Sequence, residues 1–467
     1  MNAIPITKPG KVACLLALIV VNIFIMGCSM ENKPNIEKPV RMITLDPGHF
    51  HAALVQKTMY DEVDSVVQVY APEGEDLKQH LERINAYNTR QDNPTHWKEE
   101  VHTGSDYLEK ALSERKGNLI VLAGKNKEKI DYILKSLQAG FDVLADKPMV
   151  IDAAGFEELK KAFDIAAKKN LLLYDIMTER FEITTLLQRE LSQSPEIFGT
   201  LENGTAEHPA ITKESVHHFY KYVSGAVLTR PAWFMDVSLQ GEGIVDVMTH
   251  LVDLVQWECF PEQVIDYTKD INVDAARRWA TAINLSSFKT ITKLDSFPAS
   301  LQKDVIGDSV LRVYCNGEIN YTIRGIHAKT SVTWNYKAPD GGGDTHYSIM
   351  RGTKSNLVIR QGKEEDYKPV LYIEPIKNDS LFANTLNEAF AKISAKFPGV
   401  ELYKITNGWM VKLPGDLAEG HEAHFGRVMQ NFLTYLKTKS LPAWEVPNML
   451  AKYYTTTKGL ELALKNK

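Results

Sequence analysis

The chain has 467 residues, which is too many for a single hydrophobic core, so two domains are expected. Hydrophobic residues make up 44% of the chain and charged residues 24%, which is ordinary for a soluble globular protein. The formal net charge of −5 argues against nucleic acid as a partner.

The first 27 residues have the pattern of an export signal. Lys8 and Lys11 precede the short apolar segment 12–27, which ends directly before Cys28. A basic segment followed by a short apolar one is typical of a secretory signal peptide, with an uncleaved membrane anchor as the alternative. The letters IMGC resemble the lipobox of bacterial lipoproteins, which predicts cleavage before Cys28 and lipid attachment to it. We therefore expect an exported protein, periplasmic or anchored to the outer membrane.

Residues 28–40 are polar, contain two prolines and predict a tether. Two further cysteines, Cys259 and Cys315, lie in the main part of the chain. In an oxidising compartment they are candidates for a disulfide, although the sequence does not decide the pairing.

Residues 41–178 alternate between strand and helix patterns. The apolar runs 42–45, 64–71, 118–124, 141–148 and 171–177 read as strands. Helical spacing follows in 125–140, with Gly140 as its end, and in 153–170, with Asp152 as its N-cap. Strands alternating with helices predict a doubly wound parallel sheet.

Residues 179–467 have a different texture. Segment 309–325 consists of two alternating runs around Asn316-Gly317, which predicts a hairpin turn. Runs 329–336, 346–352 and 356–362 continue the strand pattern. We therefore predict an α/β domain with an antiparallel sheet, on which helices such as 424–438 would pack.

Segment 241–257 predicts a helix with two stripes. The apolar stripe would face the core and consists of Val245, Met248, Val252 and Val255. The second stripe consists of Asp246, His250, Asp253 and Trp257. A carboxylate four residues before a histidine can orient the imidazole for acid–base chemistry, while a local hydrogen bond in an ordinary helix is the alternative.

Lys147 follows a predicted parallel strand, at the edge where open α/β sheets bind ligands. Pro148 restricts the backbone of Lys147 to extended conformations and so helps to fix the ammonium group. A solvated loop lysine is the alternative.

Together these segments resemble the glucose–fructose oxidoreductase, inositol dehydrogenase and rhizopine-catabolism (Gfo/Idh/MocA) family of sugar oxidoreductases. Asp146-Lys147-Pro148 is similar to the family's EKP, and residues 139–143 are similar to its AGKHV. The glycine-rich 241–243 leads into Asp246 and His250 as in the family, and 179–181 resembles the residues that close its Rossmann half. The resemblance implies a Rossmann domain over 41–178 and an α/β domain with a large, mostly antiparallel sheet over 179–467. The N-terminus further resembles an exported Bacteroidetes-type branch.

The resemblance also implies a nicotinamide cofactor, NAD or NADP with NAD preferred. Only Gly48 remains of the family's three glycines. Asp46 stands where the first glycine would be. The expected cofactor-binding residues are Gly48, His49, Phe50, Glu73, Asn126, Asp146 and Lys147.

The implied reaction is oxidation of a hydroxyl on a sugar or glycoside. Lys147 and His250 would share the proton transfers and Asp246 would orient His250. Outside the cytoplasm no NAD pool is at hand, so we expect a tightly held cofactor in a coupled or redox-neutral cycle, the latter including an NAD-dependent glycosidase. The other expected partners are the membrane, through the lipid anchor, and a second copy, through the C-terminal sheet.

Two further interpretations stay open. In a metal-dependent amidohydrolase barrel the ligands would be His49, His51, Lys147, His250 and Asp253. The favoured oxidoreductase needs no metal. The third interpretation is a carbohydrate-binding lipoprotein without catalytic activity.

Overall fold

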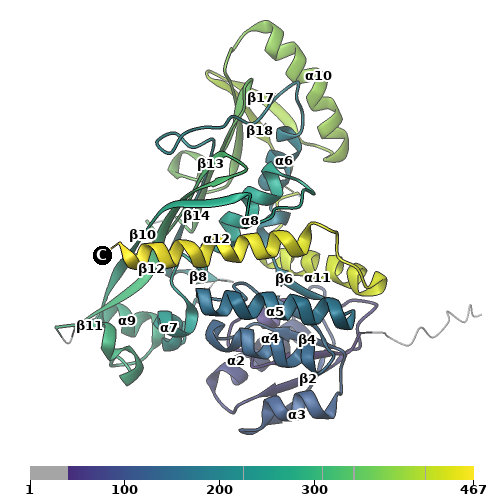
Figure 1. Cartoon of the computed structure of the whole chain (residues 1–467), viewed down its shortest axis with the longest axis vertical. Coiled ribbons are helices and arrows are strands. Elements are labelled where there is room, and N and C mark those ends of the chain that lie inside the picture. Colours follow the sequence, from purple (N-terminus) through teal and green to yellow (C-terminus); the bar gives the residue numbers. More distant parts are fainter. Residues whose placement is uncertain (1–39, 224–225, 308, 340–341, 416, 467) are drawn as a thin grey trace, which may run out of the picture. The chain divides into compact units, whose positions relative to one another are not determined.

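The N-terminal part of the chain is a six-stranded parallel sheet with strand order β3-β2-β1-β4-β5-β6 (Figure 1). Its strands are β1 (Met42–Leu45), β2 (Val66–Ala71), β3 (Lys98–Thr103), β4 (Leu119–Leu122), β5 (Asp142–Asp146) and β6 (Leu173–Ile176). The helices between them are α1 (His51–Leu54), α2 (Glu75–Thr89), α3 (Tyr107–Glu114), α4 (Asn126–Gln138) and α5 (Ala153–Lys169). This confirms the predicted doubly wound sheet, whose strand order reverses between β1 and β4.

The computed structural model describes residues 40–223, 226–307, 309–339, 342–415 and 417–466. The predicted signal peptide, Cys28 and all of the tether except Val40 lie outside these residues. None of the described helices is long and apolar enough to cross a membrane.

Two helices that pack on this sheet end at the residues predicted from the sequence: α5 begins after Asp152, and α4 ends before Gly140. The Asp152 carboxylate accepts a hydrogen bond of 2.7 Å from the backbone N–H of Gly155 and caps α5. Gly140 has φ +87° just after α4, a conformation that favours glycine. Strand β3 was not predicted, because it is an edge strand whose residues are mostly charged and partly exposed.

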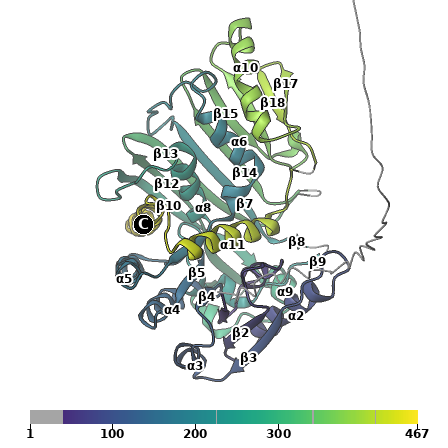
Figure 2. The same cartoon turned by 90° about the vertical axis from the view of Figure 1, so that its right-hand side faces the viewer.

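The rest of the chain builds a ten-stranded sheet in the order β10-β12-β13-β7-β14-β15-β16-β18-β17, with β11 paired to β12 (Figures 1 and 2). Its strands are β7 (Ile211–Tyr220), β10 (Ile271–Asn284), β11 (Val305–Ile306), β12 (Val310–Ile323), β13 (Ile326–Lys337), β14 (Thr345–Arg351), β15 (Ser355–Arg360), β16 (Val370–Pro375), β17 (Glu401–Ile405) and β18 (Gly408–Lys412). Strands β13 and β7 pair in parallel and the other strand pairs described in this sheet are antiparallel, which confirms the large, mostly antiparallel sheet.

The helices of this part are α6 (Ile183–Ser192), α7 (Val237–Gln240), α8 (Met248–Cys259), α9 (Leu285–Thr292), α10 (Ser380–Lys396), α11 (His421–Thr438) and α12 (Glu445–Lys465). Short 3-10 turns, η1 (Thr178–Phe181) and η2 (Ala232–Met235), and a small hairpin of β8 (Tyr222–Val223) and β9 (Ala226–Val227) complete the connections around the site. Helix α12, yellow in Figure 1, contacts α5 of the first sheet as well as α8 and β10.

The predicted hairpin turn at Asn316-Gly317 was wrong. Both residues lie inside the continuous strand β12, and the turn comes later, at 324–325. The buried Asn316 amide bonds to the carbonyl oxygen of Trp279 and accepts from the backbone N–H of Trp334, so the sheet satisfies it on both sides. Gly317 leaves room for Ile244, whose Cβ would lie 2.9 Å from a Cβ at that position. Asn316 and Gly317 therefore allow the segment that contains Ile244 to pack closely on β12, and they form no turn.

The expected position of helix α11 was also wrong. Its apolar residues, among them Phe425, Val428 and Phe432, belong to the same core cluster as β1, β4 and β5. The helix thus packs on the Rossmann part instead of the large sheet. An amphipathic pattern shows which face of a helix is buried, but it does not show which part of the protein covers that face.

The two cysteines do not form a disulfide: Cys259 and Cys315 are both free. Burial raises the pKa of both thiols, which leaves them protonated and unreactive.

Candidate active site

The centre of the site is an ion pair between Lys147, which follows β5 of the parallel sheet, and Asp246, which lies in the turns before α8. Lys147 directly follows β5, and its Nζ donates a hydrogen bond of 2.7 Å to Oδ1 of Asp246. The second carboxylate oxygen accepts from Nε2 of Gln240 at 3.2 Å. Burial alone would lower the pKa of Lys147, but the charges of Asp246 and Asp146 outweigh it and raise that pKa. Both partners of the pair are therefore charged at neutral pH.

The segment that carries Asp246 is a set of turns before α8, so the predicted helix 241–257 starts later than expected. Gly241 has φ +89°, and a Cβ at Gly243 would lie 1.8 Å from the carbonyl oxygen of Cys315. The segment lies directly on β12, which only glycine permits at this distance. The predicted apolar residues Val245, Met248, Val252 and Val255 are all buried, as expected.

His250 lies in the first turn of α8, and no hydrogen bond joins it to Asp246 among the described residues. The expectation that Asp246 orients His250 was therefore wrong, because Asp246 pairs with Lys147 and Gln240 instead. The Nδ1 atom of His250 is buried and finds no partner in the described part of the chain. Burial and the charge of Lys147 lower the pKa of His250 to about 4, so the imidazole is neutral at neutral pH.

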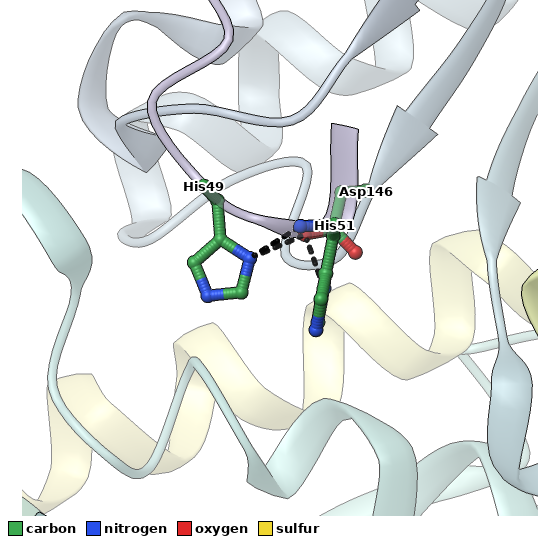
Figure 3. A group of neighbouring side chains, drawn as sticks. All are labelled: His49, His51 and Asp146. Atoms are coloured by element: carbon green, nitrogen blue, oxygen red, sulfur yellow. Dashed lines mark hydrogen bonds and ion pairs between the residues drawn. The ribbon is translucent and has the colours of Figure 1, made fainter. Parts of the chain in front are cut away.

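The turn after β1 brings two histidines to the end of β5 (Figure 3). Nδ1 of His51 lies 2.9 Å from Oδ2 of Asp146, and Nδ1 of His49 lies 3.9 Å from the same oxygen. The two imidazole rings meet edge to face with centroids 4.0 Å apart, and Phe50 packs beside them. Burial lowers the pKa of both histidines well below its usual value. Both rings are thus neutral.

Gly48 occupies the middle of this turn under a cover of side chains. A Cβ at Gly48 would lie 3.3 Å from Cζ2 of Trp233 and 3.4 Å from Oδ2 of Asp76. The indole N–H of Trp233 donates to both oxygens of Asp76, at 3.2 and 3.1 Å. Trp233, on η2, therefore packs against the turn, whereas the ring of Trp257, on α8, lies 4.5 Å from the guanidinium carbon of Arg189.

A cleft of about 630 Å³ runs along the carboxyl ends of β1 and β2. Glu73 lies at its β2 end, exposed, where a carboxylate can accept hydrogen bonds from ribose hydroxyls. Lys125, Arg230 and Lys293 bring positive charge for phosphates to the same walls. The residues at this edge thus fit a dinucleotide, although Asp46 and Asp76 add negative charge near Gly48.

Asn126 and Lys129 lie beneath the site. The Asn126 side chain donates to the carbonyl oxygen of Gln240 and accepts from Nζ of Lys129. Lys129 also donates to the carbonyl oxygens of Asp146 and Pro148, at 2.8 and 3.1 Å. Asn126 stays a predicted cofactor-binding residue, and through Lys129 its amide also supports the strand end that carries Lys147.

Asp253 does not reach the site. Its carboxylate forms hydrogen bonds of 2.7 Å with Nε and Nη2 of Arg180 and of 2.8 Å with Nζ of Lys452. Since Asp253 is engaged in this way and the sheet is not an eightfold barrel, the proposed amidohydrolase ligand set is wrong.

The sequence did not predict that Glu179 and His421 form an ion pair next to the site. Nδ1 of His421 lies 3.2 Å from Oε1 of Glu179, and its ring centroid lies 6.2 Å from that of His51. Burial would raise the pKa of Glu179, but the hydrogen bond and charge of His421 lower it below its usual range. No local pattern could have revealed this pair, because it depends on α11 returning to the first sheet.

Comparison with known families agrees with this geometry. A family model described as "Oxidoreductase family, NAD-binding Rossmann fold" matches residues 45–175. A second, described as "Putative oxidoreductase C terminal domain", matches residues 187–464. The chain belongs to the Gfo/Idh/MocA oxidoreductases. The Gfo/Idh/MocA assignment confirms the resemblance seen in the sequence and makes the first sheet an NAD-binding Rossmann domain.

Solved structures support the same assignment for this Gfo/Idh/MocA protein. A "putative oxidoreductase" from Parabacteroides merdae ATCC 43184 is 56% identical, with a TM-score of 0.90 over 92% of this chain and 98% of that one. A levoglucosan dehydrogenase in complex with NADH and levoglucosan is 12% identical, with a TM-score of 0.58 over 91% and 98%. A "putative myo-inositol dehydrogenase" from Sinorhizobium meliloti 1021 is 12% identical, with a TM-score of 0.53 over 92% and 98%. At 12% identity the two dehydrogenases show the shared fold alone. No curated protein matches the chain.

Proposed function

We propose that this protein is an NAD(P)-dependent oxidoreductase that oxidises a hydroxyl group of a sugar or glycoside. The buried Lys147–Asp246 pair at the end of β5, next to the Rossmann turn, carries the proposal. Such a pair places a fixed ammonium group where open α/β sheets bind their ligands. The levoglucosan bound to one structural neighbour supports a sugar-like substrate.

The side chains divide the proton chemistry between them. His250 is neutral, and we assign its Nε2, rather than the buried Nδ1, to accept the proton of the substrate hydroxyl. The Lys147 ammonium donates a hydrogen bond to the same oxygen and stabilises the negative charge that develops on it. Asp246 is a positioning residue that holds Lys147. A bound nicotinamide would supply the acceptor for the hydride of the neighbouring carbon.

Glu73, which lines the cleft, would hold a ribose of the cofactor, and Gly48, next to the cleft residue Pro47, would leave room for the pyrophosphate. Glu73 favours NAD, since a carboxylate there repels the extra phosphate of NADP. Phe50, His49 and Asp146 flank the path toward Lys147. If the protein is exported, the cofactor is retained and recycled, either by coupled oxidation and reduction or by a redox-neutral glycosidase cycle.

Native mass spectrometry of the purified full-length protein tests the proposal directly. We expect a mass increment of one dinucleotide per chain, and turnover on a panel of sugars and glycosides with a chromogenic electron acceptor. Lys147→Ala should remove turnover, whereas Lys161→Ala, on the exposed face of α5 beside Glu158, is the matched control. Sugar binding without dinucleotide binding would instead identify a carbohydrate-binding lipoprotein.

The location and assembly of the protein are further parts of the proposal. We expect Cys28 to carry lipid and to tie the protein to a membrane, and the large sheet to join two copies. Metabolic labelling with a fatty acid should mark the protein and should fail for Cys28→Ser. Sedimentation of the detergent-solubilised protein decides its oligomeric state.

A further inference from the structure

Three side chains with metal-binding atoms converge at the carboxyl end of β5. The ligand atoms of His49, His51 and Asp146 all lie within 4.8 Å of one another (Figure 3). His51 and Asp146 are buried, with exposed fractions of 9% and 4%, and His49 is partly buried. Among the described residues this is the one group of three such side chains close enough to share an ion.

The spacing suits a small divalent cation. With metal–ligand distances of about 2.0–2.2 Å, two ligand atoms of a tetrahedral zinc ion lie roughly 3.4 Å apart. The two distances to Oδ2 of Asp146, 2.9 Å from His51 and 3.9 Å from His49, fall on either side of that value. Each of these two distances would therefore have to change by about 0.5 Å to reach the tetrahedral spacing.

The carboxylate is not committed to a lysine. The Lys147 ammonium group is paired with Asp246, and Lys129 binds the backbone oxygen of Asp146 rather than its carboxylate. A buried carboxylate next to two imidazole rings offers the oxygen and nitrogen ligand atoms that transition metals bind.

The hydrogen bonds also identify the nitrogen atoms. The backbone N–H of His51 donates to Nδ1 of His49 at 3.3 Å, so this Nδ1 carries a lone pair and no proton, and a metal ion there would displace this long hydrogen bond. Nδ1 of His51 donates to Asp146 across 2.9 Å. A metal ion at Nδ1 of His51 would require the ring proton to lie on Nε2, which keeps the imidazole neutral and frees the Nδ1 lone pair for the ion.

We propose that His49, His51 and Asp146 form a binding site for a divalent transition metal ion of the zinc class. Two imidazoles and one carboxylate occupy three positions and leave the remaining ones open for water or a substrate oxygen. The site lies beside Lys147, so a bound ion would hold a hydroxyl oxygen near the proton-transfer groups. The inference stands on its own geometry and does not depend on the substrate or on dinucleotide binding.

Equilibrium dialysis of the full-length protein, purified through a tag without histidines, tests the site with Zn²⁺ and Co²⁺ as probes. We expect one ion per chain and a visible absorption band of Co²⁺ bound to nitrogen and oxygen ligands. His51→Gln and Asp146→Asn should each weaken binding by at least about tenfold, as loss of a ligand requires. His208→Gln, an exposed histidine outside the cluster, is the control and should bind as the parent protein does.

Stoichiometric binding that survives His51→Gln, or the absence of binding in the parent protein, overturns the proposal and leaves a His51–Asp146 hydrogen bond. If His51→Gln fails to fold, as judged by circular dichroism, the partly buried His49→Gln replaces it in the same comparison.

Discussion

Lys147 and Asp246 are 99 positions apart in the chain, yet Nζ and Oδ1 of this buried pair lie 2.7 Å from each other. The two residues come from the end of a Rossmann strand and from the turns before α8. The pair therefore links the cofactor-binding domain to the domain built on the large sheet. Its strength and its role in proton transfer can be separated by mutation.

Asp246→Asn should destabilise the protein by about 3–5 kcal/mol, because it leaves the buried Lys147 ammonium without its countercharge. Urea unfolding measures this loss. The double variant Lys147→Met with Asp246→Leu replaces both charges by apolar groups and should recover most of the stability while turnover stays absent. A double variant as unstable as Asp246→Asn would contradict this account.

The free energy of unfolding should fall as the pH is lowered from about 6.5 to about 4. Burial and the Lys147 charge lower the pKa of His250 from 6.5 to about 4, so in this window the unfolded chain binds a proton that the folded chain does not. Each such histidine contributes a slope of up to about 1.4 kcal/mol per pH unit. His250→Gln should flatten the curve only in part, since burial also lowers the pKa of His49 and His51 and brings that of His346 to about 4. An unchanged slope would show that His250 is not buried as a neutral group.

Gly243→Ala should displace the turns that carry Asp246 and so disrupt the candidate active site. The added methyl group would lie 1.8 Å from the carbonyl oxygen of Cys315, so the turns that carry Asp246 must move away from β12. We expect a loss of at least about 2 kcal/mol in stability and at least about tenfold in turnover. Gly415→Ala, where nothing lies within 4 Å of the added atom, is the matched control for thermal unfolding and kinetics.

Lys452→Met should weaken the contact between the two domains without touching the chemistry. Its fully buried Nζ lies 2.8 Å from carboxylate oxygens of both Asp175, on β6, and Asp253, on α8. Removing it leaves two buried carboxylates short of positive charge, which should cost about 3–5 kcal/mol. Turnover of the protein that remains folded should change less than about threefold; a larger loss would place this network in the catalytic machinery.

Local patterns were sufficient for much of the fold. Alternating strand and helix periodicity predicted the parallel sheet, and the caps at Asp152 and Gly140 depend only on hydrogen bonds and dihedral angles within a few residues. Lys147 could be singled out for the same reason, because the ligand edge of a parallel sheet follows from strand direction.

The wrong or missed predictions concern segments whose structure depends on what packs beside them in the folded protein. Asn316-Gly317 has the residues of a hairpin turn, but Ile244 and the backbone at Gly243 need the space that a glycine on β12 leaves. Helix α11 has an apolar face that would suit either sheet, and the core around β1, β4 and β5 is where it packs. Strand β3 has no apolar run because it lies at an edge.

Residue type and spacing thus predicted the Rossmann domain and marked Lys147, Asp246 and His250 as candidates, because strand and helix patterns can be read from near neighbours in the chain. Which carboxylate meets which base was decided only when distant segments packed together. Asp246 pairs with Lys147 instead of His250, and Asp146 turns to the histidines of the first turn. A buried charge takes the nearest available partner in space, and sequence separation places no limit on which partner that is.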